Sequence, residues 1–182
     1  MFQLRPEAPT DGPAIEALLD RVFGIRRRHK TSYRYRLGIE PVRPLCLVAE
    51  KEGRLVGTIR YWPVRVGRMP ALLLGPVASA PGHAGNGIGR ALIETSLQRA
   101  AELGHDLVLL VGNPEYYARF GFAPAPPSIH MPGEDPARLQ YKRLGATGRP
   151  LPTGLLRRAD ADRVAGDCGP AVFALDPGVY GA

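Results

Sequence analysis

The stretch Gly82-His83-Ala84-Gly85-Asn86-Gly87-Ile88-Gly89-Arg90 lies between a predicted strand and a predicted helix, and it decides the fold. Glycines at such a junction let the backbone turn its amide hydrogens toward one point and let a ligand approach closely. The unpaired N–H groups of the first helical turn and the helix dipole then favour a bound phosphate or pyrophosphate. Arg90 in that first turn is unfavourable for the dipole unless an anion lies nearby. The stretch therefore predicts a phosphate-binding loop.

Two other phosphate motifs do not fit this stretch. A Walker loop requires a Gly-Lys-Ser/Thr triplet, which the chain does not contain. A dinucleotide fingerprint starting at Gly85 would place its third glycine at Arg90, although Asp106 stands about 20 residues on, where that motif has an acid. The remaining alternative is a glycine-rich connection that lets helix and sheet pack closely, but three alternate glycines exceed that need.

The segments after the loop predict a parallel βαβ unit. Residues 88–103 have helical periodicity, and Gly104 is expected to end the helix. Residues 106–112 form a near-continuous apolar run, which is typical of a strand buried on both faces. A strand, a helix and a strand in this order predict a right-handed crossover. The small or apolar helix face comprises Gly89, Ile93, Ser96, Leu97, Ala100 and Gly104.

The segments before the loop predict an antiparallel meander, because short connections join antiparallel neighbours. Thr10 or Asp11 is expected to cap the first helix. After Ala123 the chain is rich in proline and loses its periodicity. A meander together with one βαβ unit predicts an α+β or mixed α/β fold. The other expected elements are strands at 2–5, 45–50, 55–61, from Ala71 onward and at 171–175, a helix ending before Gly24, and a short helix at 33–37.

The strand that precedes the loop contains an interruption at Gly75-Pro76. Proline cannot donate to a strand ladder, and glycine permits unusual backbone angles, so the pair indicates a bulge or a sheet edge. A bulge here would leave backbone groups of Val77 and Ala78 free for another partner.

The interrupted strand and the loop together resemble the GCN5-related N-acetyltransferases (GNAT). The family's pyrophosphate loop has the form Gln/Arg-x-x-Gly-x-Gly/Ala and follows a bulged strand, and Pro76-Val77-Ala78-Ser79 with residues 84–92 keeps that order. Ala84 departs from the pattern, so only backbone amides are expected to bind there. The resemblance covers about residues 45–122. It implies one domain over 1–182 with a central mixed sheet, helices on both faces and acetyl-CoA or CoA as co-substrate.

A tyrosine is the general acid that the resemblance implies. The family carries Tyr-x-x-x-Gly-Phe after its fifth strand, and residues 117–122 fit this pattern. A phenol of pKa ~10 can protonate the departing CoA thiolate, although Tyr117 could also be a core aromatic. The string at 113–122 looks like the YhbS-like branch of the family. The implied cofactor-binding residues are Val77, Ala78, Ser79, Ala84, Gly85, Asn86, Gly87, Ile88, Gly89, Arg90, Asn113, Tyr116 and Phe120.

The base that removes the substrate's proton is left open by the sequence. Glu115 and Glu50 are candidates by position, and a water chain serves equally well. Cys46 and Cys168 would suggest a thioester on the protein, but neither has a recognisable histidine partner. Their spacing also predicts no metal site.

Length and composition restrict the function classes. A chain of 182 residues suits one domain, and no apolar run approaches the ~20 residues that span a bilayer. The N-terminus lacks a signal-peptide core, and two unpaired cysteines fit a cytoplasmic protein. The net charge of +7 and the basic run at 26–30 raise a nucleic-acid alternative. A solvated loop is the favoured interpretation of that run.

These features predict an N-acetyltransferase that moves an acetyl group from acetyl-CoA to a primary amine of a small molecule or peptide. Direct attack in a ternary complex is expected, with a backbone N–H near Val77 or Ala78 polarising the thioester. Splayed fourth and fifth strands would admit the pantetheine arm. The alternative is a non-catalytic acyl-CoA-binding or regulatory module of the same fold. A homodimer is possible.

Overall fold

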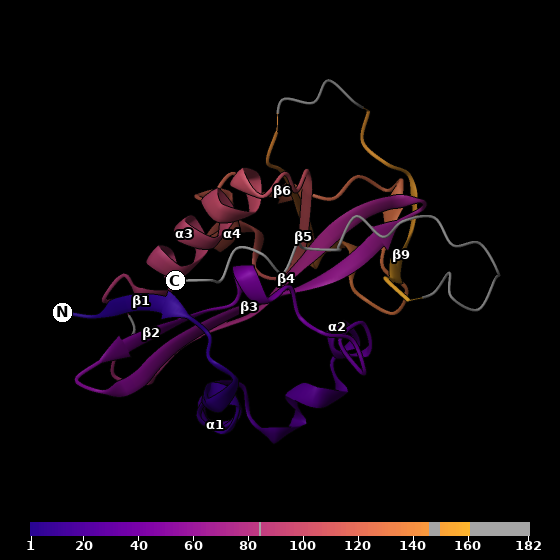
Figure 1. Ribbon diagram of the computed structural model, residues 1–182. Helices are drawn as coiled ribbons and strands as arrows, with labels where there is room; N and C mark the ends of the chain where they lie inside the picture. The colour runs from indigo at the N-terminus through magenta and orange to yellow at the C-terminus, as the bar shows by residue number, and fades with distance from the viewer. Residues whose placement is uncertain (84, 146–149, 161–182) are drawn as a thin grey trace.

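The computed structural model describes residues 1–83, 85–145 and 150–160 and has a mixed β-sheet at its centre. Figure 1 shows helices α1 (Gly12–Phe23) and α2 (Thr31–Arg34) on one face, and α3 (Ile88–Glu102) and α4 (Pro114–Ala118) on the other. The predicted α+β architecture with helices on both faces is confirmed. The strands run in the order β1 (Gln3–Pro6), β2 (Leu47–Lys51), β3 (Arg54–Val66), β4 (Met69–Ser79), β5 (Leu107–Val111), β8 (Leu139–Arg143) and β6 (Ala123–Pro124).

Helix α1 covers the meander through its buried face, which carries Ile15, Leu18 and Leu19. The predicted cap at its start is wrong, because no side chain caps the helix. Asp11 instead accepts hydrogen bonds from the Ala8 N–H at 2.7 Å and from the Arg5 guanidinium at 2.6 Å. The carboxylate therefore ties β1 to the turn η1 (Pro9–Asp11). The expected second helix occurs slightly earlier than predicted, as α2, after the turn η2 (Ile25–His29).

Strands β2, β3 and β4 form the predicted antiparallel meander. Strand β2 begins later than expected, because the turn η3 (Arg43–Leu45) precedes it. Strand β3 continues to Val66 and is long enough to pair with β2 along its first half. The predicted bulge is confirmed, since Ile59 faces Val77 while Tyr61 faces Leu74. Two residues of β4, Gly75 and Pro76, therefore stand opposite one residue of β3.

Helix α3 connects β4 to β5 as the predicted βαβ unit, and these two strands run parallel. Its buried face partly differs from the prediction, because Ile88 and Leu92 are buried and Gly104 is exposed. A Cβ added to Gly57 would stand 2.5 Å from the Ile88 side chain. Close contact between α3 and the sheet thus depends on a glycine in β3.

After Ala123, where the sequence loses its periodicity, the described chain still forms short strands. Strand β8 runs antiparallel to β5, and β9 (Gly154–Arg158) pairs with the far half of β3 and with β7 (Ile129–His130). The turn η4 (Pro136–Arg138) leads into β8. The strand expected at 171–175 lies outside the described residues. No helix in the described ranges is long and apolar enough to cross a membrane.

Candidate active site

Strands β4 and β5 diverge at the centre of the sheet. Their parallel register is confined to Leu72–Val108 and Leu73–Leu109 among the described residues. Beyond that point β4 stays paired with β3, while the end of β5 pairs with β8. The bulge lies where the divergence begins. Because the two strands separate there, their facing N–H and C=O groups do not hydrogen-bond to each other.

The direction of the Val77 amide follows from the ladder between β3 and β4. The Ala80 N–H donates to the Val56 carbonyl at 2.8 Å, so these facing residues form a hydrogen-bonded pair. Bonded and non-bonded pairs alternate along an antiparallel ladder, and the register from Ala80 back to Val77 is uninterrupted. The Val77 N–H therefore points away from β3, toward the gap beside β5, whereas the Ala78 N–H bonds to β3. Of the two amides predicted for the thioester, the geometry favours Val77.

The glycine loop enters α3 without a side-chain cap. Gly87 occupies the N-cap position with φ 76°, and Gly85 has φ 85°. Both are exposed, and a Cβ added to either would meet nothing within 4 Å, so their backbone angles rather than crowding require glycine. Free N–H groups in the first turn of a helix fit a phosphate group. Ala84 lies outside the described residues.

Several predicted residues gather at the start of α3. A Cβ on Gly89 would stand 3.3 Å from the Tyr116 hydroxyl and 3.6 Å from Ser79 Oγ. Arg90 is exposed, and its Nε donates to Glu94 Oε1 at 2.8 Å. The Glu94 carboxylate thus partly neutralises the Arg90 charge, which is unfavourable at the positive end of the helix dipole. The side chain of Ile88 is buried in the core, so only its backbone faces this site.

Asn113 and the helix that it begins position the two tyrosines. The Asn113 side chain accepts a hydrogen bond from the Tyr116 N–H at 3.1 Å and so caps α4. The Tyr117 ring packs in edge contacts against Tyr116 and Phe122, at 5.0 Å and 5.9 Å between ring centroids. Phe120 is buried beside them. The sequence offered catalytic and core interpretations of Tyr117. The structure shows that its ring has a packing role, and its catalytic role stays a prediction.

Gly112 is a site residue that the sequence analysis missed. A Cβ on Gly112 would lie 2.2 Å from Cε2 of Tyr117, so the ring occupies space that only glycine leaves free. Burial raises the pKa of Tyr117 to about 12, and the neighbouring Tyr116 adds to the shift. Tyr117 therefore keeps its proton at neutral pH, as a general acid must.

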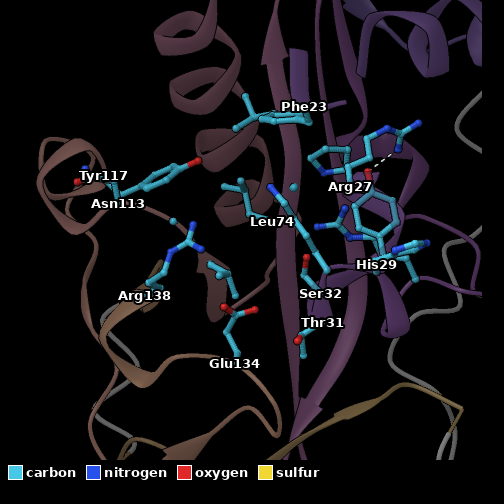
Figure 2. Close-up of a pocket in the computed structure, with 18 residues that line it drawn as sticks. Phe23, Arg27, His29, Thr31, Ser32, Leu74, Asn113, Tyr117, Glu134 and Arg138 are labelled. Atoms are coloured by element: carbon cyan, nitrogen blue, oxygen red, sulfur yellow. Dashed lines mark hydrogen bonds between the residues drawn. The ribbon is translucent and has the colours of Figure 1, made fainter. Parts of the chain in front are cut away.

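A cavity of about 420 Å³ lies beside Tyr117. Figure 2 shows Tyr117 and Asn113 on one side and the residues of the α1–α2 segment on the other, with Leu74 of β4 between them. Gly75, Pro76 and Val77 of the bulge also line it. The bulge, the end of β5 and the tyrosine thus meet around one space large enough for a small substrate.

The acids proposed from the sequence do not line this cavity. Glu50 bonds Arg5 at 2.9 Å on the far strands, and Glu115 is exposed in the first turn of α4. Glu134 is the acid that lines the cavity among the described residues. It lies in the segment after Ala123, where the sequence has no periodicity, and no local signal marks it. Glu134 is therefore a further candidate for the base, which the sequence left open.

The remaining alternatives from the sequence have little support in the geometry. Cys46 is buried and its thiol donates to the Val42 carbonyl at 3.4 Å, while burial raises its pKa to about 12, which disfavours a nucleophilic thiolate. Cys168 lies outside the described residues. In the basic run at 26–30, Arg27 is buried and paired with Glu16 and Asp20. The run is therefore not a uniformly free cationic patch.

Comparison with known proteins identifies similar chains. The family described as acetyltransferase (GNAT) domain matches residues 3–125. The uncharacterized N-acetyltransferase YhbS of Escherichia coli K12 is 34% identical over 122 residues, which cover 65% of this chain and 72% of that protein. The uncharacterized N-acetyltransferase YjhQ of the same strain is 33% identical over 133 residues, covering 68% and 74%.

Two solved structures extend the similarity to three dimensions. The structure of E. coli YhbS in complex with CoA has a TM-score of 0.74 and 30% identity, covering 92% of this chain and 95% of that chain. A GNAT family acetyltransferase from Brucella melitensis in complex with acetyl-CoA has a TM-score of 0.65 and 26% identity, covering 86% and 95%.

Proposed function

The chain belongs to the GNAT acetyltransferase family, and we propose that it transfers an acetyl group from acetyl-CoA to a primary amine by direct attack in a ternary complex. One observation carries the proposal: a buried tyrosine, Tyr117, and a backbone amide directed away from β3, that of Val77, meet where two strands diverge. Tyr117 and Val77 line the same cavity, and β4 leads from it to the glycine loop. The solved structures of similar chains that hold CoA and acetyl-CoA support this assignment.

The residues at the start of α3 fit the pyrophosphate of CoA. The first-turn amides after Gly87 have no side-chain cap, and Ser79 Oγ and the Tyr116 hydroxyl lie beside Gly89. Amides and hydroxyls that converge at the positive end of a helix dipole suit a diphosphate. The missing Gln or Arg at Ala84 is then compensated by backbone donors.

The acyl end of the co-substrate would lie against the bulge. Acetyl-CoA supplies a thioester whose carbonyl carbon accepts the amine lone pair, so that the C–N bond forms as the C–S bond breaks. The Val77 N–H, aimed into the gap, can donate to the carbonyl oxygen as negative charge develops on it. Tyr117 can donate its proton to the sulfur that leaves with the electron pair. The ammonium protons pass to water or to Glu134, and solvent restores the tyrosine proton.

A turnover assay tests this function directly. CoA release from acetyl-CoA is measured with a thiol reagent across small amines, aminoglycosides, polyamines and peptide N-termini. We expect release that depends on the amine and an acetylated product of the corresponding mass. Binding of CoA by calorimetry without turnover of any amine would instead favour the non-catalytic module.

A further inference from the structure

The cavity beside Tyr117 has an unequal distribution of charge. Glu134 is its acidic side chain among the described residues, whereas its basic side chains are Arg27, His29, Lys30, Arg36 and Arg138. Figure 2 shows Glu134 and Arg138 approaching from one wall and Thr31 and Ser32 from the opposite wall. Thr31 Oγ1 donates to the Gly133 carbonyl at 2.7 Å, which ties the two walls together. A cavity with this lining has a positive potential that attracts anions.

Arg27 contributes little to that potential because carboxylates neutralise it. Its guanidinium bonds Glu16 at 2.5 Å and Asp20 at 2.7 Å. The nearby Arg60 is likewise paired, with Glu7 at 2.7 Å. Arg27 therefore has a structural role in the wall, and Arg60 lies outside the lining of this cavity.

Arg36 differs from them because no carboxylate bonds it within the described residues. Its Nε and Nη1 are buried without a hydrogen-bond partner, and its guanidinium lies 4.6 Å from the centre of the Tyr33 ring. Burial lowers the pKa of Arg36 to about 10. The Tyr33 hydroxyl raises this pKa and the charges of Arg27 and Arg60 lower it, and the group remains charged at neutral pH. Tyr33 compensates the burial of this charge only in part, and an anionic ligand would offset the remaining cost.

The position of Arg36 places this charge next to the proposed reaction centre. Its Nη2 lies 3.3 Å from where a Cβ on Gly75 would stand, and Gly75 is part of the bulge. Lys30 and Arg138 are exposed residues that also line the cavity. Neither makes an ion pair among the described side chains, although the Lys30 ammonium lies over the Phe23 ring at 5.3 Å. Three cations without a carboxylate partner among the described residues therefore line the cavity: Lys30 and Arg36 come from the segment around α2, whereas Arg138 comes from the same segment as Glu134.

We propose that the acceptor is a small amine that also carries an anionic group, a carboxylate or a phosphate. Arg36, with Lys30 and Arg138, attracts the anionic group, while Glu134 faces the ammonium. Polyamines and other polycations are disfavoured, because the cations that attract the anionic group repel them. The inference rests on the proposed transferase function for its chemistry, but the anion site can be tested by binding alone.

Matched acceptor pairs test the specificity. O-phosphoethanolamine is compared with ethanolamine, and β-alanine with β-alaninamide, so that the two pairs distinguish phosphate from carboxylate. We expect the acidic member of at least one pair to have a kcat/KM about tenfold or more above its neutral partner, the scale of a hydrogen bond to a charged group. Equal use of both members in both pairs, or a preference for the neutral members, would overturn the proposal.

Charge-removing variants locate the site. Arg36→Met should remove most of the preference for the acidic amine and leave the KM for acetyl-CoA unchanged. The double variant Lys30→Met with Arg138→Met alters only exposed side chains, so it still tests the anion site if Arg36→Met does not fold. It should weaken the same preference for the acidic amine. Arg54→Met, in the exposed β2–β3 hairpin, makes the same charge change away from the cavity and serves as the control. A preference that survives in both folded cavity variants would contradict the assignment.

Calorimetry separates this proposal from the transferase proposal. O-phosphoethanolamine and β-alanine are titrated into the protein without acetyl-CoA. Binding that is lost in the cavity variants but kept in Arg54→Met supports the anion site even if no acetyl transfer occurs. Turnover of neutral amines without binding of either acidic amine would contradict the anion site but not the transferase function.

Discussion

Tyr117 is fixed by the shape of its surroundings. Gly112 leaves the space that the ring occupies, and the rings of Tyr116 and Phe122 hold its edges. No hydrogen bond to its hydroxyl is present among the described residues. A phenol held in this way has its proton available for a ligand, and burial keeps that proton in place at neutral pH.

Replacing Tyr117 by Phe removes the hydroxyl proton and keeps the ring, so it tests catalysis separately from packing. Phe keeps the ring, so we expect the protein to fold and to bind acetyl-CoA as before. General acids contribute ~10²–10⁴-fold, and a thiolate is already a fair leaving group, so kcat should fall near the low end, about a hundredfold. Because burial raises the pKa of Tyr117 to about 12, the acid form persists in alkali. Wild-type kcat should therefore show no loss from this group up to about pH 10.

Tyr116→Phe is the matched control for this prediction, since Tyr116 is the adjacent tyrosine on the same helix. Steady-state kinetics over a pH series compares the two variants. Removing the Tyr116 hydroxyl should weaken CoA binding at most, because that hydroxyl lies beside Gly89 rather than in the cavity. Equal effects of both variants on kcat, or a full kcat in Tyr117→Phe with the chemical step limiting, would make Tyr117 a packing residue.

The glycine loop shows which elements the sequence can predict. The loop, α3 and β5 follow one another along the chain, so their glycine spacing and periodicity are local signals. The bulge is also local, because Gly75-Pro76 interrupts a strand pattern. Strands β6 and β7 contain two residues each and pair with distant segments, so they leave no periodic signal of their own.

A carboxylate in the loop tests the element that binds phosphate. Gly87→Asp places a negative charge at the start of α3, where the pyrophosphate is expected, and should raise the Kd for CoA about tenfold or more in calorimetry. Gly53→Asp is the matched control, because Gly53 also has a left-handed φ, 70°, and no atom within 4 Å of an added Cβ. Both variants carry similar backbone strain. If both bind CoA equally well, the loop is not the phosphate site.

At the scale of the whole molecule, the cavity combines segments that are far apart in the sequence. Arg36 comes from the chain after α2, Glu134 from the segment before η4, and Gly75 from β4. Tyr117 and Asn113 could be predicted because they stand at fixed distances within one motif. Arg36 and Glu134 could not, because a basic residue near a tyrosine and an acid in a proline-rich segment have ordinary surface interpretations. Only the folded sheet brings them together.

The core also makes the stability of the whole molecule depend on pH. Burial raises the pKa of Cys46 to about 12 and that of Tyr117 to about 12, and it also raises the pKa values of Tyr35 and Tyr61. The folded protein therefore holds these protons at a pH where the unfolded chain has released them. Stability is fully present below the unfolded pKa values and falls as pH rises through the folded ones.

We expect the free energy of unfolding to decline above about pH 9, where an unfolded thiol ionises. Cys46 alone should account for a loss on the order of 1 kcal/mol by about pH 10. Urea unfolding under reducing conditions, at a series of pH values from 7 to 10, measures the decline. Cys46→Ala loses packing equally at every pH, so comparing its pH slope with that of the wild type isolates the titration. Its decline should be shallower by the contribution of the thiol. If the two slopes are the same, the thiol is not the group that titrates, and the buried tyrosines remain as the source of the alkaline instability.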